Sequence, residues 1–370
     1  MIDDNWHENY GTLDFDSRRF PDPRSMVEHL HGLGFTVMLW VCPFITPDSP
    51  VFRALRRMGY LIRDAKGRPA IREWWNGFSA ILDLTHPEAE QWIKGKLEKL
   101  MQAYGIDGFK FDAGDPDYYA PDDVTYKPAT PNEQCELWAR LGVHYRYNEY
   151  RACWKMGGQP LVQRLSDKNH SWGPDGLGSL IPNGLAQGLL GFAFSCPDMV
   201  GGGQYEDLIR PDFEVDQELF VRYAQCAALF PMLQFSTAPW RVLDQKHAAI
   251  CIQAALLHAE MGEHIEELAV QAGLTGEPTI RHLAYRYPGM GYEAVKDQFL
   301  LGDHVLVAPV VQKGATRRKV VFPSGKWLGD DGSAVMGPCE LEVDAPLERL
   351  PWYKAMQPEP EFICLLRKSC

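Results

Sequence analysis

Short apolar runs alternate with longer helical patterns through most of the chain, and this alternation limits the possible folds more than any other feature. Residues 35–41 suit a fully buried strand, and residues 86–104 predict a helix that opens on Pro87 and stops at Gly105. Strands joined by helices form a parallel sheet with right-handed crossovers. Further strands are predicted at residues 108–112, 160–165, 189–194, 229–233 and 280–285, and a further helix at 248–261.

Two parallel architectures fit this alternation: an open doubly wound sheet and a closed (β/α)8 barrel. No Gly-x-Gly-x-x-Gly follows a first strand and no phosphate-binding loop motif occurs, so nucleotide binding lacks its usual loop. Acidic and aromatic residues instead follow strand after strand, and a barrel gathers such strand ends into one mouth. We therefore favour the barrel. The strand-end residues are Asp3, Asp4, Trp40, Asp112, Asp167 and Asp198.

From about residue 297 the pattern changes to strands punctuated by Gly and Pro. Residues 298–309, 319–323 and 340–343 read in this way. We therefore predict two domains, a barrel over residues 1–292 and a small antiparallel β domain of the sandwich type over residues 293–370.

Composition excludes several classes of partner. Hydrophobic residues make up 45% of the chain and charged residues 23%, as in an ordinary globular protein. No run of about 18 apolar residues occurs, so no membrane association is expected. The 37 basic and 49 acidic residues give a net charge of −12, which repels phosphate backbones. Nucleic acid is therefore not an expected partner.

The nine cysteines form no Cys-x-x-Cys pair, so zinc and redox motifs find no support. Several of them, such as Cys42 and Cys226, lie in apolar runs typical of small buried side chains, which favours a reducing compartment. The chain opens on Met-Ile-Asp-Asp, without the features of a secretion signal. These features predict a cytoplasmic location.

The segment 108–115 carries the strongest chemical signal. Side chains alternate along a strand, so Phe109 and Phe111 face the helices while Lys110 and Asp112 face the barrel interior. A lysine beside a carboxylate keeps it ionised, as a nucleophile requires. A buried structural ion pair explains the same residues, and Lys110 could instead form a Schiff base, as in aldolases.

Other strand ends supply further candidates. Asp167 could donate a proton if burial raises its pKa, and Arg164 could hold hydroxyl groups or a carboxylate; Asp175 is the alternative acid. Asp198 precedes three glycines, which let a ligand approach the backbone closely. A helix cap is the ordinary explanation for Asp167 and Asp175, and a turn is the ordinary explanation for Asp3 and Asp4, whereas Asp198 is read as a hydroxyl acceptor. Further hydroxyl-binding candidates are Asp3, Asp4 and Trp6.

Metal ions and cofactors are not expected. Asp112, Asp115 and Asp117 could form a metal cluster, but the residues that follow look like a solvated loop, and no His or Glu lies at a complementary spacing.

Together these motifs resemble glycoside hydrolase family 31, whose members are retaining α-glycosidases on a (β/α)8 barrel. The likeness covers nearly the whole chain, with several motifs in the family's order. The segments that carry it are residues 15–23, 40–45, 73–77, 83–89, 110–115, 297–299 and 302–310. The amino-acid sequence around Asp112 and at residues 197–202 most resembles the branch that holds the myogenesis-regulating glycosidase, which is associated with α-galactosidase activity.

The resemblance assigns roles to individual residues. It implies that Asp112 is the nucleophile, that Asp167 is the general acid and base, and that Arg164 is a sugar-binding arginine. Asp198 matches the acidic residue before the family's glycines. Substrate-binding residues are then expected to be Asp3, Asp4, Trp6, Trp40, Lys110, Arg164 and Asp198.

The chain departs from the family in two places. The family usually carries Arg-Asn-His on the seventh strand, where this chain has Gln234-Phe235-Ser236, which weakens a glucose-specific reading. Family members also have a β-sandwich and a first barrel strand before the segment that matches Asp3. The strand ends account for seven strands, so we expect a barrel that lacks its first strand and an incomplete N-terminus.

The resulting prediction is a retaining α-glycosidase that hydrolyses terminal α-linked sugars, with a lean toward α-galactosides over α-glucosides and α-xylosides. Its partner is a carbohydrate substrate. Double displacement places the Asp112 and Asp167 carboxyl groups about 5–5.5 Å apart. The alternative is a non-catalytic sugar-binding or scaffolding remnant of a glycosidase.

Overall fold

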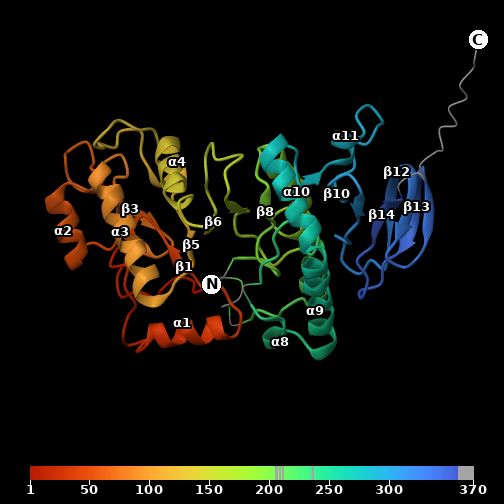
Figure 1. Cartoon of the computed structure of the whole chain (residues 1–370), viewed down its shortest axis with the longest axis horizontal. Helices are drawn as coiled ribbons and strands as arrows, with labels where there is room; N and C mark the ends of the chain where they lie inside the picture. The colour runs from red at the N-terminus through yellow and green to blue at the C-terminus, as the bar shows by residue number, and fades with distance from the viewer. Residues whose placement is uncertain (205–206, 208–209, 211, 236, 357–370) are drawn as a thin grey trace, which may run out of the picture. The chain divides into compact units, whose positions relative to one another are not determined.

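The computed structural model describes residues 1–204, 207, 210, 212–235 and 237–356 (Figure 1). Contacts divide the chain into two compact units, Met1–Arg164 and Leu165–Cys370. Each unit is built around its own set of strands and helices. Among the described residues, no helix has both the length and the apolar character needed to cross a bilayer.

Four parallel strands form the centre of the first unit. In sheet order they are β1 (Met38–Val41), β5 (Gly108–Phe111), β6 (Tyr147–Tyr150) and β7 (Val162–Arg164). Their register sets Lys110 beside Trp40 on one neighbour and Glu149 on the other. The predicted strands at 35–41, 108–112 and 160–165 are confirmed, with slightly narrower bounds.

Four helices and a small sheet complete this unit. Each helix has proline in its first turn, where the missing N–H is not needed. The predicted helix at 86–104 is confirmed: His86 caps it and Gly105, at φ 77°, ends it. The helices are α1 (Pro23–Gly32), α2 (Pro50–Met58), α3 (Pro87–Tyr104) and α4 (Pro131–Gly142), with a 3₁₀ turn η1 (Pro116–Tyr118). The antiparallel sheet has the order β2 (Phe44–Ile45), β4 (Gly77–Ile81), β3 (Ile71–Trp74).

The second unit begins with helices that pack around α7 (Gln217–Ala227), where every residue from Leu219 onward is buried. Two of these buried residues are polar, and their side chains donate to backbone carbonyl groups: Arg222 to Ala345 and Gln225 to Leu347. The other elements are η2 (Leu177–Ser179), α5 (Leu180–Leu189), β8 (Phe194–Cys196), α8 (Pro239–Val242), α9 (Gln245–Glu260) and α10 (Gly262–Thr275).

A six-stranded antiparallel sheet follows, which confirms the predicted C-terminal antiparallel β domain, although its first strand already lies at Ile280–Arg281. Its strand order is β13-β12-β14-β11-β10-β9. The strands are β9 (Ile280–Arg281), β10 (Phe299–Leu301), β11 (Val305–Val307), β12 (Arg317–Gly329), β13 (Ala334–Asp344) and β14 (Trp352–Met356), with α11 (Leu283–Arg286) after β9.

Three strand predictions in this unit were wrong in place or type. The strand expected at 189–194 is β8, because α5 runs to Leu189 and a turn at Gly191 intervenes. Residues 229–233 form no strand, although Gln234 bridges to Met199 in parallel. The strand expected at 280–285 ends after two residues, because the His282 side chain caps the helix α11 that follows. These two residues pair antiparallel with β10.

Candidate active site

Asp112 follows the last residue of β5, and its backbone N–H donates to the Val41 carbonyl at 2.9 Å. The predicted alternation is confirmed, since Phe111 packs on Trp138 on one side of the strand. On the other side, Lys110 Nζ lies 3.7 Å from Asp112 Oδ2. Asp112 is only 6% exposed, so its carboxylate is almost fully withdrawn from water.

Three kinds of group hold the Asp112 carboxylate. The indole N–H of Trp40 donates to Oδ2 at 2.7 Å, and the backbone N–H of Ala113 donates to Oδ1 at 2.8 Å. Arg151 Nε lies 3.7 Å from Oδ1, opposite the side that faces Lys110. Every one of these neighbours stabilises a negative charge.

Burial by itself raises the pKa of a carboxyl group. At Asp112 the charges of Lys110 and Arg151 outweigh burial, and the pKa falls to about 2. The charge of Arg164 and the hydrogen bond from Trp40 act in the same direction. Asp112 is therefore an anion at neutral pH, as a carboxylate nucleophile must be.

Lys110 is held as a cation. Burial alone would lower the pKa of its ammonium group, but Asp112 and Asp3 raise the pKa above its ordinary value. Its Nζ donates to Asp3 Oδ1 at 3.2 Å. A protonated amine cannot attack a carbonyl carbon, so this geometry disfavours the Schiff-base alternative.

Arg151, which the sequence analysis did not single out, is the main addition to the site. It follows β6, and its Nη2 donates to Asp115 Oδ2 at 2.6 Å. Its guanidinium carbon lies 4.7 Å from the centre of the Trp75 ring, within cation–π range. The i, i+2 spacing of Glu149 and Arg151 could have indicated that both side chains lie on the same face of the sheet, but strand β6 was not predicted.

The predicted sugar-binding residue Arg164 lies in the interior, with 1% of its surface exposed. Its Nε is 3.5 Å from Glu149 Oε1. Burial raises the pKa of Glu149, and the charges of Lys110 and Arg164 oppose that rise. Glu149 pairs with Lys110 in the sheet, so Arg164 lies near the site, and its positive charge helps to lower the pKa of Asp112. A direct contact of Arg164 with a sugar stays a prediction.

Asp4 is held by neutral donors. The Tyr10 hydroxyl donates to it at 3.0 Å and Asn76 Nδ2 at 2.6 Å. Burial raises the pKa of Asp4, although these hydrogen bonds oppose the rise. Asp3 is more exposed and pairs with Lys110. The two neighbouring acids therefore differ: Asp3 balances a cation, whereas Asp4 joins a hydrogen-bond network.

Trp6 and Trp40, both predicted to contact substrate, are 1% and 2% exposed. The Trp6 indole N–H donates to the Trp40 carbonyl at 2.7 Å, so Trp6 fixes the backbone of the residue that donates to Asp112. A sugar contact for either tryptophan stays a prediction.

Asp167 and Asp198 belong to the second unit and approach each other there. A side-chain carbon added at Gly203 would come 2.9 Å from Asp167 Oδ1 and 2.8 Å from Asp198 Oδ1, so both carboxylates crowd this glycine. Asp198 is completely buried at φ 89°, and its Oδ2 accepts the backbone N–H groups of Lys168 at 2.7 Å and Gly203 at 3.0 Å. Asp167 is partly exposed.

Two other sequence-based candidates lie elsewhere. Asp175, the alternative acid, is exposed and accepts hydrogen bonds from Ser171 and Asn169 within its own loop. Ser236, which falls where the family has its histidine, lies outside the described residues. In the part of the chain that the structure describes, no three His, Cys, Asp or Glu side chains are grouped to hold a metal ion.

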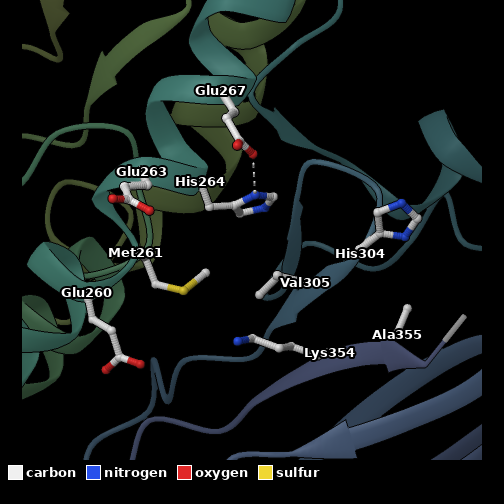
Figure 2. Close-up of a pocket in the computed structure, with 9 residues that line it drawn as sticks. All are labelled: Glu260, Met261, Glu263, His264, Glu267, His304, Val305, Lys354 and Ala355. Atoms are coloured by element: carbon white, nitrogen blue, oxygen red, sulfur yellow. Dashed lines mark ion pairs between the residues drawn. The ribbon is translucent and has the colours of Figure 1, made fainter.

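A separate cavity of about 420 Å³ lies in the second unit, between the start of α10 and strands β11 and β14. Figure 2 shows that His264 points into it and that Glu267 lies against the same imidazole. None of the predicted site residues lines this cavity. Its lining residues are Glu260, Met261, Glu263, His264, Glu267, His304, Val305, Lys354 and Ala355.

Comparison with known proteins supports the resemblance. Residues 1–260 match the TIM-barrel domain of glycosyl hydrolases family 31, and residues 276–355 match the C-terminal domain of the same family. The mouse (Mus musculus) myogenesis-regulating glycosidase is 36% identical over 359 residues, which cover 94% of this chain and 50% of that protein. The sulfoquinovosidase of Escherichia coli (strain K12) is 24% identical, covering 92% of this chain and 53% of that protein.

Solved structures agree on the fold. A family 31 sulfoquinovosidase from E. rectale, bound to an aza-sugar inhibitor, has a TM-score of 0.83 at 21% identity and covers 94% of this chain and 54% of that one. An α-xylosidase from a soil metagenome, bound to xylose, has a TM-score of 0.83 at 22% identity, with 96% and 58% covered. The chain spans about half the length of the relatives it matches. It belongs to glycoside hydrolase family 31, with the TIM-barrel domain of that family followed by its C-terminal domain.

Proposed function

We propose that this chain is a retaining α-glycosidase that hydrolyses a terminal α-linked sugar by double displacement. The observation that carries the proposal is the state of Asp112: a buried strand-end carboxylate, kept ionised by Lys110 and Arg151 and oriented by the Trp40 indole. A buried carboxylate of this kind is prepared to attack an electrophilic carbon.

The reaction has two steps. In the first, an Asp112 oxygen forms a bond to the anomeric carbon while the bond to the leaving oxygen breaks, and Asp167 gives that oxygen a proton. In the second, Asp167 takes a proton from water, the water oxygen bonds to the anomeric carbon, and Asp112 is released. Support for Asp167 is its family position and its partial exposure, which lets a leaving group reach it.

The substrate is inferred to be a neutral sugar with an α-galactoside preference. The sequences of the motifs and the 36% identity with the mouse myogenesis-regulating glycosidase support the branch of the family to which that protein belongs. Charge argues against a sulfonated sugar, because the cations around Asp112 already face carboxylates: Lys110 faces Asp3 and Arg151 faces Asp115. Asp3 and Asp4 would also repel an anionic substituent.

A panel of aryl α-galactoside, α-glucoside, α-xyloside and α-sulfoquinovoside substrates tests the proposal. We expect turnover of a neutral substrate with retained configuration, and loss of that turnover in Asp112→Ala. Appreciable activity in Asp112→Ala would reject Asp112 as the nucleophile. Binding of a sugar without turnover by the unaltered chain would favour the non-catalytic alternative.

Two further assignments belong to this proposal. We place the barrel domain at residues 1–292 and the β domain at 293–370. We also infer a cytoplasmic location, supported by the free cysteines of the described chain, six of which are buried. Thiol counting on protein isolated without reductant tests this inference, because paired cysteines would contradict it.

A further inference from the structure

His7 is a buried ionisable residue that the proposed reaction does not use. Its side chain is surrounded by aromatic rings, with centroid distances of 4.7 Å to Trp6, 5.0 Å to Tyr10 and 6.5 Å to Trp40. The planes of His7 and Trp40 are inclined by only 17°, so the two rings lie nearly parallel. Only 7% of His7 is exposed.

Packing, rather than hydrogen bonding, holds this imidazole. Its Nδ1 is buried and has no hydrogen-bond partner among the described residues. Burial lowers the pKa of His7 to about 4, so the ring is uncharged at neutral pH. A neutral ring adds no charge to the balance of carboxylates and cations around Asp112.

The stack leads directly to Asp112. Trp40 donates its indole N–H to Asp112 Oδ2 at 2.7 Å, and the direction of that N–H depends on the rotation of the Trp40 side chain. Strand pairing and the Trp6 hydrogen bond fix the Trp40 backbone, but they do not fix its ring. Two flat neighbours contact the indole: Tyr10 meets it edge-on at 6.1 Å, and His7 lies parallel to it.

We propose that His7 is a positioning residue, whose uncharged ring stacks on Trp40 and keeps the indole N–H directed at the Asp112 carboxylate. The catalytic consequence rests on the proposed function, whereas the effect on Trp40 does not. A planar apolar ring should therefore replace His7, and a side chain without a flat face should not.

The experiment records the indole N–H resonances of the chain labelled with ¹⁵N-tryptophan, with the Trp40 signal assigned by its loss in Trp40→Phe. The variants are His7→Phe, His7→Ala and His7→Leu, the last of which keeps bulk without a planar face. Phe15→Leu is the matched control, because Phe15 packs on Trp6, Phe20 and Tyr104 and has no ring contact with Trp40.

We expect the Trp40 resonance to move in His7→Ala and His7→Leu, and to stay in His7→Phe and Phe15→Leu. The two non-aromatic variants should lose up to about tenfold in kcat, no more than removal of the Trp40 indole itself, with little change in KM, because a misdirected nucleophile lowers the rate more than binding. A Trp40 signal unmoved in both of these variants, or moved equally by Phe15→Leu or His7→Phe, would overturn the proposal. If the unaltered chain hydrolyses no glycoside, the proposed function fails while the resonances still decide the role of His7.

Discussion

Asp112 and Asp198 are both buried carboxylates at the carboxyl end of a strand, yet their surroundings differ. Asp112 is faced by two cationic side chains, Lys110 and Arg151, and by the Trp40 indole. Asp198 is completely buried, and its Oδ2 is held by the backbone N–H groups of Lys168 and Gly203. Side chains can change rotamer when an acid forms a new bond, whereas backbone amides in a tight loop cannot move without changing the loop.

The difference separates two uses of a buried acid. The charge of Asp112 is balanced by groups that keep other partners when it reacts: Lys110 retains Asp3 and Arg151 retains Asp115. Asp198 instead closes the loop that brings Asp167 and Gly203 together. We therefore expect substitution of Asp112 to remove activity, and substitution of Asp198 to remove structure.

The largest expected effect is on Asp112. Asp112→Asn keeps the shape and an acceptor for Trp40 but cannot form a covalent bond to the sugar, so kcat/KM should fall by more than about a thousandfold. Thermal unfolding should show a smaller loss of stability than Asp198→Ala does. Activity within tenfold of the unaltered chain would end the assignment.

Asp198→Ala should mainly destabilise the second unit. The backbone N–H groups of Lys168, which is buried, and Gly203, which is partly buried, would lose their acceptor, at a cost of about 2–4 kcal/mol in the free energy of unfolding. Denaturant titration measures this loss. Asp198→Asn, which keeps an acceptor oxygen, is the control and should recover a good part of the stability. Equal losses in both variants would show that the negative charge, rather than the acceptor, is what the loop requires.

Trp40→Phe should have a moderate effect on rate and pH dependence. The pKa of Asp112, about 2, lies below its ordinary value of 3.8, so its ionised form stabilises the fold above that range and this contribution is lost as pH falls toward 2. Removing the indole donor raises the pKa of Asp112. The acid limb of kcat/KM should therefore move to higher pH, with a loss of about tenfold in kcat.

Trp138→Phe is the control for this shift. Trp138 donates to the Asp112 backbone carbonyl at 3.2 Å and leaves the carboxylate alone. In Trp138→Phe, the acid limb of the kcat/KM profile should stay at the same pH as in the unaltered chain. An equal displacement in both variants would mean that packing, and not the hydrogen bond from Trp40, sets the acidity of Asp112.

The smallest expected effect is on Asp175, the alternative to Asp167 as the acid. It is exposed, and its carboxylate accepts hydrogen bonds from two neighbours in its own loop, Ser171 and Asn169. Asp175→Asn should change kcat/KM by less than about twofold, since the residue is exposed and the substitution keeps an acceptor oxygen for its loop. A loss comparable to that of Asp167→Asn would instead make Asp175 the proton donor.

The elements that could be predicted from the sequence are those set by residues close together along the chain. The helix at 86–104 was predictable because Pro87 and Gly105 act within one turn of its ends. The placement of Asp112 and Lys110 on one face of β5 followed from strand geometry. The strand predicted at 229–233 was wrong: Leu229 and Phe230 are buried in a non-strand segment after α7, and an apolar run does not distinguish a buried strand from a buried loop.

Arg151 shows the opposite case. It lies directly after β6, a strand that was not predicted because two polar residues, Asn148 and Glu149, occupy its centre. Parallel pairing sets Phe111 beside Tyr150, the residue before Arg151, and this register brings the guanidinium to the carboxylate. Nothing within a few positions of Arg151 specifies that meeting.

The sequence by itself determined the family, the strand-helix alternation, and the acids that end the strands, because these depend on side-chain type and short-range order. Only the tertiary structure decided the ionisation of Asp112. Its pKa depends on charges from β5, β6 and β7, on an indole from β1 and on the exclusion of water. Electrostatic interactions depend on distance in space, and folding brings together groups that are far apart along the chain.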